Sequence, residues 1–203
     1  MAFPDFFARV PTIVLRDPLA QFLGATDDGR IEYGFSDAVK LAGHSCPTVA
    51  GAYLMTCRAL KALYGDDIPE RGGLRVDFRD AQGNGVTGVI GSIVTLLTGA
   101  TGPGGFKGLA GRYSRRDLLQ FGAGDVAGEV RFTRLDNGRS VSAAVDLSAI
   151  PADPRMPALL QGLLAGQADP EAARLFGQVW QDRVRRILID HFDDPEVVRL
   201  TTP

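Results

Sequence analysis

Gly43-His44-Ser45-Cys46-Pro47-Thr48 is the stretch around which the fold of this chain is expected to be organised, because it separates two predicted helices. The segment from Ser36 to Ala42 has a favourable N-cap residue at its start and is followed by Gly43, a residue that commonly ends helices. On the other side, Pro47 suits the first position of a helix, and a long apolar run extends from Val49 to Tyr64. The four residues between these helices, Gly43 to Cys46, are therefore predicted to form a tight corner.

The corner contains one of the two histidines of the chain, His44, and one of its two cysteines, Cys46. Cys46 is expected at or beside the N-cap of the second helix, where backbone N–H groups and the helix dipole favour a thiolate. An imidazole beside a thiolate suits zinc, copper or iron rather than magnesium. We therefore predict that His44 and Cys46 bind a transition metal, with zinc as the first choice. The alternative is that His44 caps the preceding helix and Cys46 packs in the core.

The composition is that of an ordinary globular protein: the chain has 203 residues, of which 45% are hydrophobic and 23% are charged. A net charge of −2 argues against a nucleic-acid partner, and the absence of an uninterrupted apolar run of about 20 residues argues against a membrane partner. If Cys46 and Cys57 share one helix, a rise of roughly 1.5 Å per residue separates them by about 16 Å, too far for a disulfide. Together with an N-terminus that does not resemble a signal peptide, this predicts a cytoplasmic protein.

Several segments have strand-like patterns. Leu74 to Asp80 alternates apolar and charged residues, which predicts a strand with one face in water. Leu118 to Phe121 is a further candidate strand. Asn137-Gly138 lies between two alternating arms, Glu129 to Leu135 and Ser140 to Leu147, and predicts a β-hairpin.

Four segments outside the central corner are expected to be helical. Asp17-Pro18 favours a short helix over Leu19 to Leu23, and Val86 to Leu97 is expected to be a short strand at Val86-Thr87 that passes into a helix. Ala158 to Leu164 predicts a short helix, and Asp169-Pro170-Glu171 begins a long amphipathic one. This last helix is expected to pack on the sheet or on a partner subunit.

The predicted fold class is therefore α+β, with an antiparallel or mixed sheet whose C-terminal hairpin strand pair packs against helices. Residues 1–34 are expected to form an N-terminal segment, residues 35–150 an α+β domain and residues 151–203 a C-terminal helical segment. The three segments are expected to make one compact unit.

The segment from Thr98 to Gly108 has an unusual composition, with five glycines and a single lysine. Its backbone N–H groups are candidates for an anion cradle in which Lys107 supplies a point charge, and the arginines that follow raise the local positive charge. The alternative is a connection that lets two backbones approach closely. The segment lacks the Walker order of residues, which argues against a nucleotide site. The candidate ligand- or anion-binding residues are Thr98, Gly99, Lys107 and Arg112.

Two motifs resemble those of a known family. Gly43-His44-Ser45-Cys46-Pro47, followed by the small-residue helix Val49–Tyr53, resembles the HGHxCPG-x-x-x-GY signature of the FmdE family, named for a protein associated with molybdenum formylmethanofuran dehydrogenase. Leu97–Thr101 with the glycine-rich loop and Lys107 looks like the LTGxT-x-GKGN segment of that family. The resemblance covers roughly Phe35 to Phe121.

The resemblance implies an α+β domain that is often dimeric and that holds a metal, commonly zinc, through its histidine–cysteine motif and a further cysteine. His44 and Cys46 match the motif, whereas Ala42 occupies the position of its first histidine and Val89 that of the further cysteine. The aspartate that usually precedes the LTG segment is Ser92 here. A four-ligand zinc site within one subunit is therefore not expected.

Two protein ligands would need completion from another source. A symmetric partner, His191 or a carboxylate such as Asp37 are the candidates within the protein. Haem is the alternative cofactor, because its macrocycle supplies four nitrogens and needs only His44 or Cys46 as an axial ligand.

Two functions remain open. The first is a homodimeric binding protein that holds a transition metal or haem at His44 and Cys46. The second is a small metalloenzyme that acts on an anionic substrate near the glycine-rich loop, with Lys107 and Arg112 as electrostatic stabilisers. The enzyme hypothesis predicts a concave pocket that joins the His–Cys corner to the glycine-rich loop, and it identifies no catalytic residue.

Overall fold

The structure is a computed structural model that describes residues 3–166 and 169–202. The predicted segments 1–34 and 151–203 therefore include five positions, residues 1, 2, 167, 168 and 203, that lie outside the described residues. The helices are α1 (Pro18–Phe22), α2 (Phe35–Ala42), α3 (Pro47–Tyr64), α4 (Thr87–Thr98), α5 (Met156–Leu164) and α6 (Pro170–Arg185), with a 3-10 turn at Asp5–Arg9 and a π turn at Arg186–Asp190. The strands are β1 (Ile13–Arg16), β2 (Arg30–Tyr33), β3 (Leu74–Phe78), β4 (Leu119–Gln120), β5 (Val130–Arg134), β6 (Ser140–Val145) and β7 (Val198–Thr201).

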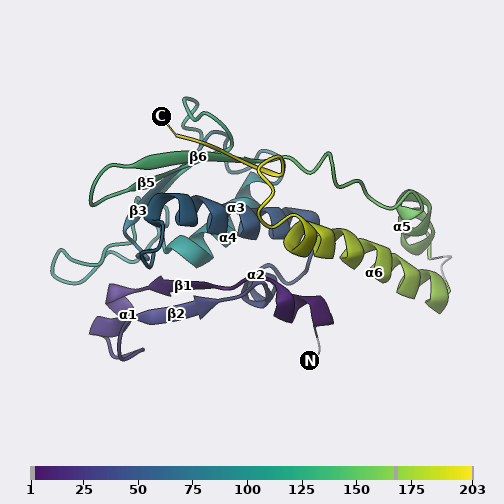
Figure 1. The fold of residues 1–203 in the computed structure, drawn as a ribbon, viewed down its shortest axis with the longest axis horizontal. Helices are drawn as coiled ribbons and strands as arrows, with labels where there is room; N and C mark the ends of the chain where they lie inside the picture. The colour runs from purple at the N-terminus through teal and green to yellow at the C-terminus, as the bar shows by residue number, and fades with distance from the viewer. Residues whose placement is uncertain (1–2, 167–168, 203) are drawn as a thin grey trace.

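These elements form the predicted α+β fold, arranged in layers (Figure 1). The main sheet has the strand order β4-β3-β5-β6-β7, in which β4 is parallel to β3 and every other pair is antiparallel. Helices α3 and α4 pack beneath this sheet, and the small antiparallel sheet β1-β2 lies on their other side (Figure 1). Helices α5 and α6 extend away from the layers as a pair.

Helix α3 is the centre of the core, because 13 of its 18 residues are buried. A helix that is apolar all round must be covered on every side, and α3 is covered by β6, α4, α2 and the end of α6. Gly51 permits the approach of the sheet: a Cβ added there would lie 3.2 Å from Val145 Cγ1 of β6. Burying each large side chain of this helix, such as Leu54 or Leu60, stabilises the fold by roughly 1.5–3 kcal/mol.

The strongest local predictions are confirmed. β5 and β6 form the predicted hairpin around Asn137-Gly138, with Phe132 opposite Val141. Helix α3 begins at Pro47, and α6 begins at Pro170 with Asp169 as its N-cap. Each of these elements carries its own start or turn signal within a few residues.

Other boundaries were wrong. Helix α2 begins at Phe35 rather than after a Ser36 cap, because Asp37 Oδ2 accepts a hydrogen bond from the Gly34 N–H at 3.0 Å. No strand precedes α4, which begins at Thr87 directly after Val86. β1 and β7 were not predicted at all, since both depend on pairing with distant segments.

The charged face of β3 that was predicted to lie in water is exposed at Arg75 but buried at Asp77. Asp77 is only 1% exposed, in a strand that lies inside the sheet between β4 and β5. The buried carboxylate forms ion pairs with Arg75 at 2.9 Å and with Arg131 at 3.4 Å. The alternation of apolar and charged residues therefore reflects a buried charge pair at this position.

None of the helices within residues 3–166 and 169–202 is both long and apolar enough to cross a lipid bilayer.

Candidate functional site

The predicted corner between α2 and α3 is present, and the first helix ends at Gly43 in the left-handed conformation. Cys46 is the N-cap of α3, and its Sγ accepts a hydrogen bond from the Val49 N–H at 3.4 Å. His44 is exposed, and its Nδ1 lies 3.0 Å from the Ala42 carbonyl oxygen. That contact requires a hydrogen on Nδ1, so Nε2 carries the lone pair of the neutral ring.

The corner is held from outside by α6, a contact that sequence analysis missed. Trp180 Nε1 donates to the Ser45 carbonyl at 2.9 Å, and Ser45 Oγ donates to Gln181 Oε1 at 2.9 Å. These bonds connect residues more than 130 positions apart. They fix the backbone between His44 and Cys46 against the C-terminal helix.

The side chains near this corner do not complete a metal site with more than two protein ligands. Within residues 3–166 and 169–202 there is no group of three or more His, Cys, Asp or Glu side chains placed to hold a metal ion. Asp37 bonds to Gly34 N–H and Lys40, and His191 Nδ1 pairs with Asp194 Oδ2 at 2.8 Å. A four-ligand zinc site does not fit these residues, and a metal bound by His44 and Cys46 alone stays a prediction.

The second cysteine does not supply a replacement donor. Cys57 lies in the interior of α3, and burial raises the pKa of its thiol to about 12. Both cysteines are free thiols. A neutral, buried thiol behaves as a small apolar side chain.

A cavity of about 700 Å³ lies along α4, and we call it the α4 cleft. It extends from Leu41 at the end of α2 to Thr101, Gly102 and Pro103 of the glycine-rich loop. Its other lining residues are Gln82, Gly88, Gly91, Ser92, Thr95, Leu96, Asp117, Leu119, Gln120 and Phe121. The cleft reaches the glycine-rich loop but its lining does not include His44 or Cys46.

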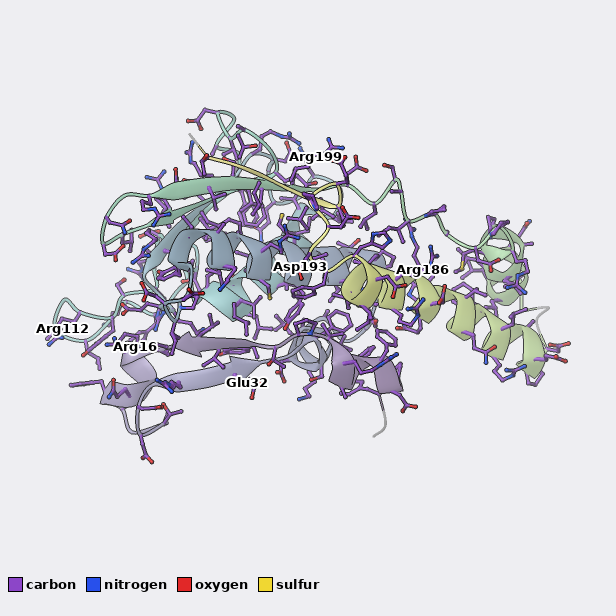
Figure 2. The ribbon with its side chains drawn as sticks, in the orientation of Figure 1. Arg16, Glu32, Arg112, Arg186, Asp193 and Arg199 are labelled. Carbon is purple, nitrogen blue, oxygen red and sulfur yellow. The ribbon has the colours of Figure 1, made fainter. Side chains whose placement is uncertain are left out.

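A second cavity, of about 360 Å³, has a very different lining, and we call it the arginine pocket. Its residues come from the end of β1, the loop before β3 and the segment after the glycine-rich loop: Arg16, Pro18, Glu70, Arg71, Gly72, Arg112, Tyr113, Ser114 and Arg115. Figure 2 shows Arg16 and Arg112 at the same end of the molecule. The pocket therefore gathers four arginines and one glutamate.

Asp17 lies behind the pocket and holds two of these arginines. Its Oδ1 accepts from Arg115 Nη2 and its Oδ2 from Arg71 Nη1, each at 2.6 Å, while the side chain is only 6% exposed. Oδ1 also caps α1 by accepting the N–H groups of Leu19 and Ala20. Burial alone would raise the pKa of Asp17, but the Ala20 N–H and the charges of Arg115 and Arg71 outweigh it and lower the pKa.

Arg71 and Arg115 differ in how completely their donors are used. Arg71 also donates from Nε to the Leu97 carbonyl and from Nη2 to the Leu96 carbonyl, at the C-terminal end of α4. Arg115 is 91% buried as a side chain, and its Nη1 is a buried atom with no hydrogen-bond partner among the described residues. Burial lowers the pKa of Arg115, and the neighbouring Asp17 opposes that effect.

Two glycines make room for the Arg115 guanidinium. A Cβ at Gly72 or at Gly99 would collide with Nη1, and both residues have positive φ angles, +77° and +70°. The backbone of Arg115 is also fixed: its N–H donates to the Phe106 carbonyl at 2.8 Å, and its carbonyl accepts from Thr101 N at 3.0 Å and Oγ1 at 2.6 Å. The glycine-rich loop thus positions one arginine at the pocket.

The structure separates the four predicted anion-binding residues. Arg112 lines the arginine pocket, and Gly99 lies against Arg115 beneath it. Thr98 is buried, and its Oγ1 donates to the Val94 carbonyl at 2.7 Å, so its hydroxyl hydrogen is directed into α4. Lys107 is exposed and lies outside the lining of both cavities.

Sequence analysis missed Arg16, Arg71 and Asp17 as members of this site. Asp17 was identified as the start of a helix, which it is, but its pairing with residues 54 and 98 positions away has no local signal. Arg115 was noticed only as part of a local charge excess. A cluster of arginines contributed by separate segments becomes visible when the fold brings them together.

Comparison of the chain with protein-family models and with curated proteins gave no match. The resemblance to the FmdE family therefore stays a prediction carried by the motifs around His44 and the glycine-rich loop.

We expect Asp17→Asn to lower the free energy of unfolding by about 3 kcal/mol, because removal of one partner from a buried ion pair leaves the arginines uncompensated. Urea unfolding at neutral pH measures the change. Asp66→Asn is the control, since it removes an exposed partner of Lys61 and should leave the midpoint almost unchanged.

The same pair of proteins tests the lowered pKa of Asp17. A carboxylate with a lowered folded-state pKa stabilises the fold above its ordinary value of about 3.9, and this contribution is lost as the pH falls through the folded-state value. The difference in stability between the wild type and Asp17→Asn should be constant at neutral pH and shrink below about pH 4. A difference that persists undiminished in acid would contradict the charge-pair explanation.

Proposed function

We propose that this chain binds a small anionic molecule in the arginine pocket. The observation that carries the proposal is the buried Nη1 of Arg115, a charged donor without a partner among the described residues at the wall of a cavity lined by three further arginines. A buried, unsatisfied donor on a charged group is costly, and an anion that approaches the pocket would reduce that cost electrostatically.

The charges at the pocket are not balanced by the protein. Glu70 lines it and Asp17 lies behind it, against four arginines. Within the described part of the chain, neither Arg16 nor Arg112 has an acidic side chain within 4 Å. An excess of positive charge with two guanidinium groups that have no acidic partner among the described residues favours a ligand with a carboxylate or phosphate group.

The dimensions favour a small ligand. A cavity of about 360 Å³ lies at the lower end of the range for small-molecule sites. Arg112 stacks over the Tyr113 ring at 5.1 Å, and Tyr113 contacts Phe22 of α1, so the outer wall is held by aromatic contacts. Ser114 Oγ accepts the Arg116 N–H at 3.3 Å, which leaves its hydroxyl hydrogen to donate to a ligand. These features support binding, and we assign no catalytic residue.

Isothermal titration with inorganic phosphate and with succinate tests the proposal. We expect Arg112→Ala to raise the Kd about tenfold, because hydrogen bonds to charged groups contribute roughly 1.5–3 kcal/mol. Arg174→Ala is the matched control: it removes an exposed arginine of α6, at the opposite end of the molecule (Figure 1). The affinity of that variant should equal that of the wild type.

A ligand held by arginines should also bind less tightly as salt is raised, and Arg112→Lys should recover part of the loss. If neither anion binds the wild type at millimolar concentration, or if Arg112→Ala and Arg174→Ala weaken binding equally, the arginine pocket is not the site.

The transition metal predicted at His44 and Cys46 is a second proposal, supported by the position of Cys46 as the N-cap of α3 and by the exposure of His44. We propose that these two residues supply the protein donors and that a second subunit or the ligand supplies the rest. The predicted homodimer belongs to the same proposal.

Elemental analysis of protein purified without chelator, with its absorption spectrum, tests this second proposal. We expect near-stoichiometric metal in the wild type, zinc before haem, and its loss in both His44→Ala and Cys46→Ala. Cys57→Ala is the control, because that thiol is buried within α3. Full metal occupancy in either corner variant, or a metal-free wild type, would contradict the ligand assignment.

A further inference from the structure

We propose that the α4 cleft is a separate binding site for an aromatic molecule that carries a cationic amino group. This ligand has the opposite charge to the one proposed for the arginine pocket, and the two cavities share none of their lining residues. The inference therefore goes beyond the proposed function and does not depend on it.

The aromatic part of the ligand follows from the wall of the cleft. Phe121 lies against the backbone of α4 at Gly91, where an added Cβ would be 2.7 Å from its ring. Its ring stacks on the buried Phe78 with 4.8 Å between the centroids, so the ring has a fixed orientation. Phe121 itself is partly exposed and lines the cleft with Leu96. A flat apolar surface of this kind favours stacking by an aromatic ring.

The charge of the ligand follows from Asp117. It is the one ionisable side chain among the described residues that line the cleft, and it has no basic partner within 4 Å in the described part of the chain. Its backbone is in the left-handed region, with φ of +60°, and its N–H donates to the Gly102 carbonyl at 3.3 Å. A non-glycine residue held in this conformation next to a cavity is a common feature of binding sites.

The remaining polar lining can accept or donate hydrogen bonds without adding charge. Gln82, Gln120 and Thr95 lie around the apolar surface. The volume of about 700 Å³ is in the middle of the range for small-molecule sites, and a mainly apolar lining with a few polar groups is typical of them. An amine that reaches Asp117 while its ring lies on Phe121 satisfies both features.

Two probes with the same indole ring and opposite charge test the proposal: tryptamine and indole-3-propionate, titrated into the full chain and followed by NMR. We expect tryptamine to bind about threefold to fivefold more tightly, the difference that an exposed ion pair provides. Asp117→Asn should remove that preference, because it weakens the binding of tryptamine and relieves the repulsion of the indole-3-propionate carboxylate. Asparagine tolerates the left-handed conformation, so this variant keeps the backbone.

A glycine pair tests the position of the ring. Gly91→Ala should weaken both probes, because the new Cβ displaces Phe121, whereas Gly177→Ala in α6, with open space around it, should change neither. Thr95 is a half-buried residue of the cleft lining, and Thr95→Phe should also weaken the binding of both probes because the ring fills the cavity. This second variant tests the proposal even if Gly91→Ala fails to fold. Equal affinities for the two probes, an unchanged preference in Asp117→Asn, or unchanged binding in Thr95→Phe would each overturn the proposal.

Discussion

The carboxylate of Asp17 joins three parts of the chain that are distant from one another in the sequence. It caps α1, and it receives one guanidinium from the loop before β3 and another from the segment after the glycine-rich loop. Arg71 in turn binds two carbonyl groups at the C-terminal end of α4, where a cation also opposes the negative end of the helix dipole. One buried carboxylate thus fixes the small N-terminal sheet, α4 and the glycine-rich loop relative to one another.

This arrangement leaves the positive charge of the two arginines only partly neutralised. Asp17 has two oxygens, and one of them is shared between the cap of α1 and Arg115. Two arginines against one carboxylate cannot be neutral, and the Arg115 guanidinium is held against Gly72 and Gly99, where only glycine leaves room for it. Burial of an uncompensated cation is unfavourable. Anion binding is therefore expected to lower the free energy of this pocket more than that of a solvated arginine cluster of the same size.

Sequence analysis recovered the elements whose signals are local and missed those whose partners are distant. The Asn137-Gly138 hairpin, the start of α3 at Pro47 and the Asp169 cap each depend on neighbouring residues, and all three are as predicted. β7 becomes a strand by pairing with β6 more than 50 positions earlier. For the same reason, Arg112 was found from the local charge, whereas Arg71 and Asp17 were not. At Asp77, a charge in alternation was interpreted as exposure, although its partners Arg75 and Arg131 allow it to be buried.

Overall charge was the least informative property of the sequence for this protein. A net charge of −2 excludes an overall excess of basic residues, yet the chain has one cavity lined by four arginines and another whose described lining has a single carboxylate. The separation occurs within three residues, because Arg115 lines one cavity and Asp117 lines the other. The Thr101 N–H and hydroxyl both donate to the Arg115 carbonyl, which fixes the backbone there. The left-handed conformation of Asp117 turns the chain at this point. The glycine-rich loop thus holds the segment from Arg115 to Asp117 in a position where its side chains bring opposite charges to two cavities. The net charge of the sequence does not reveal this distribution.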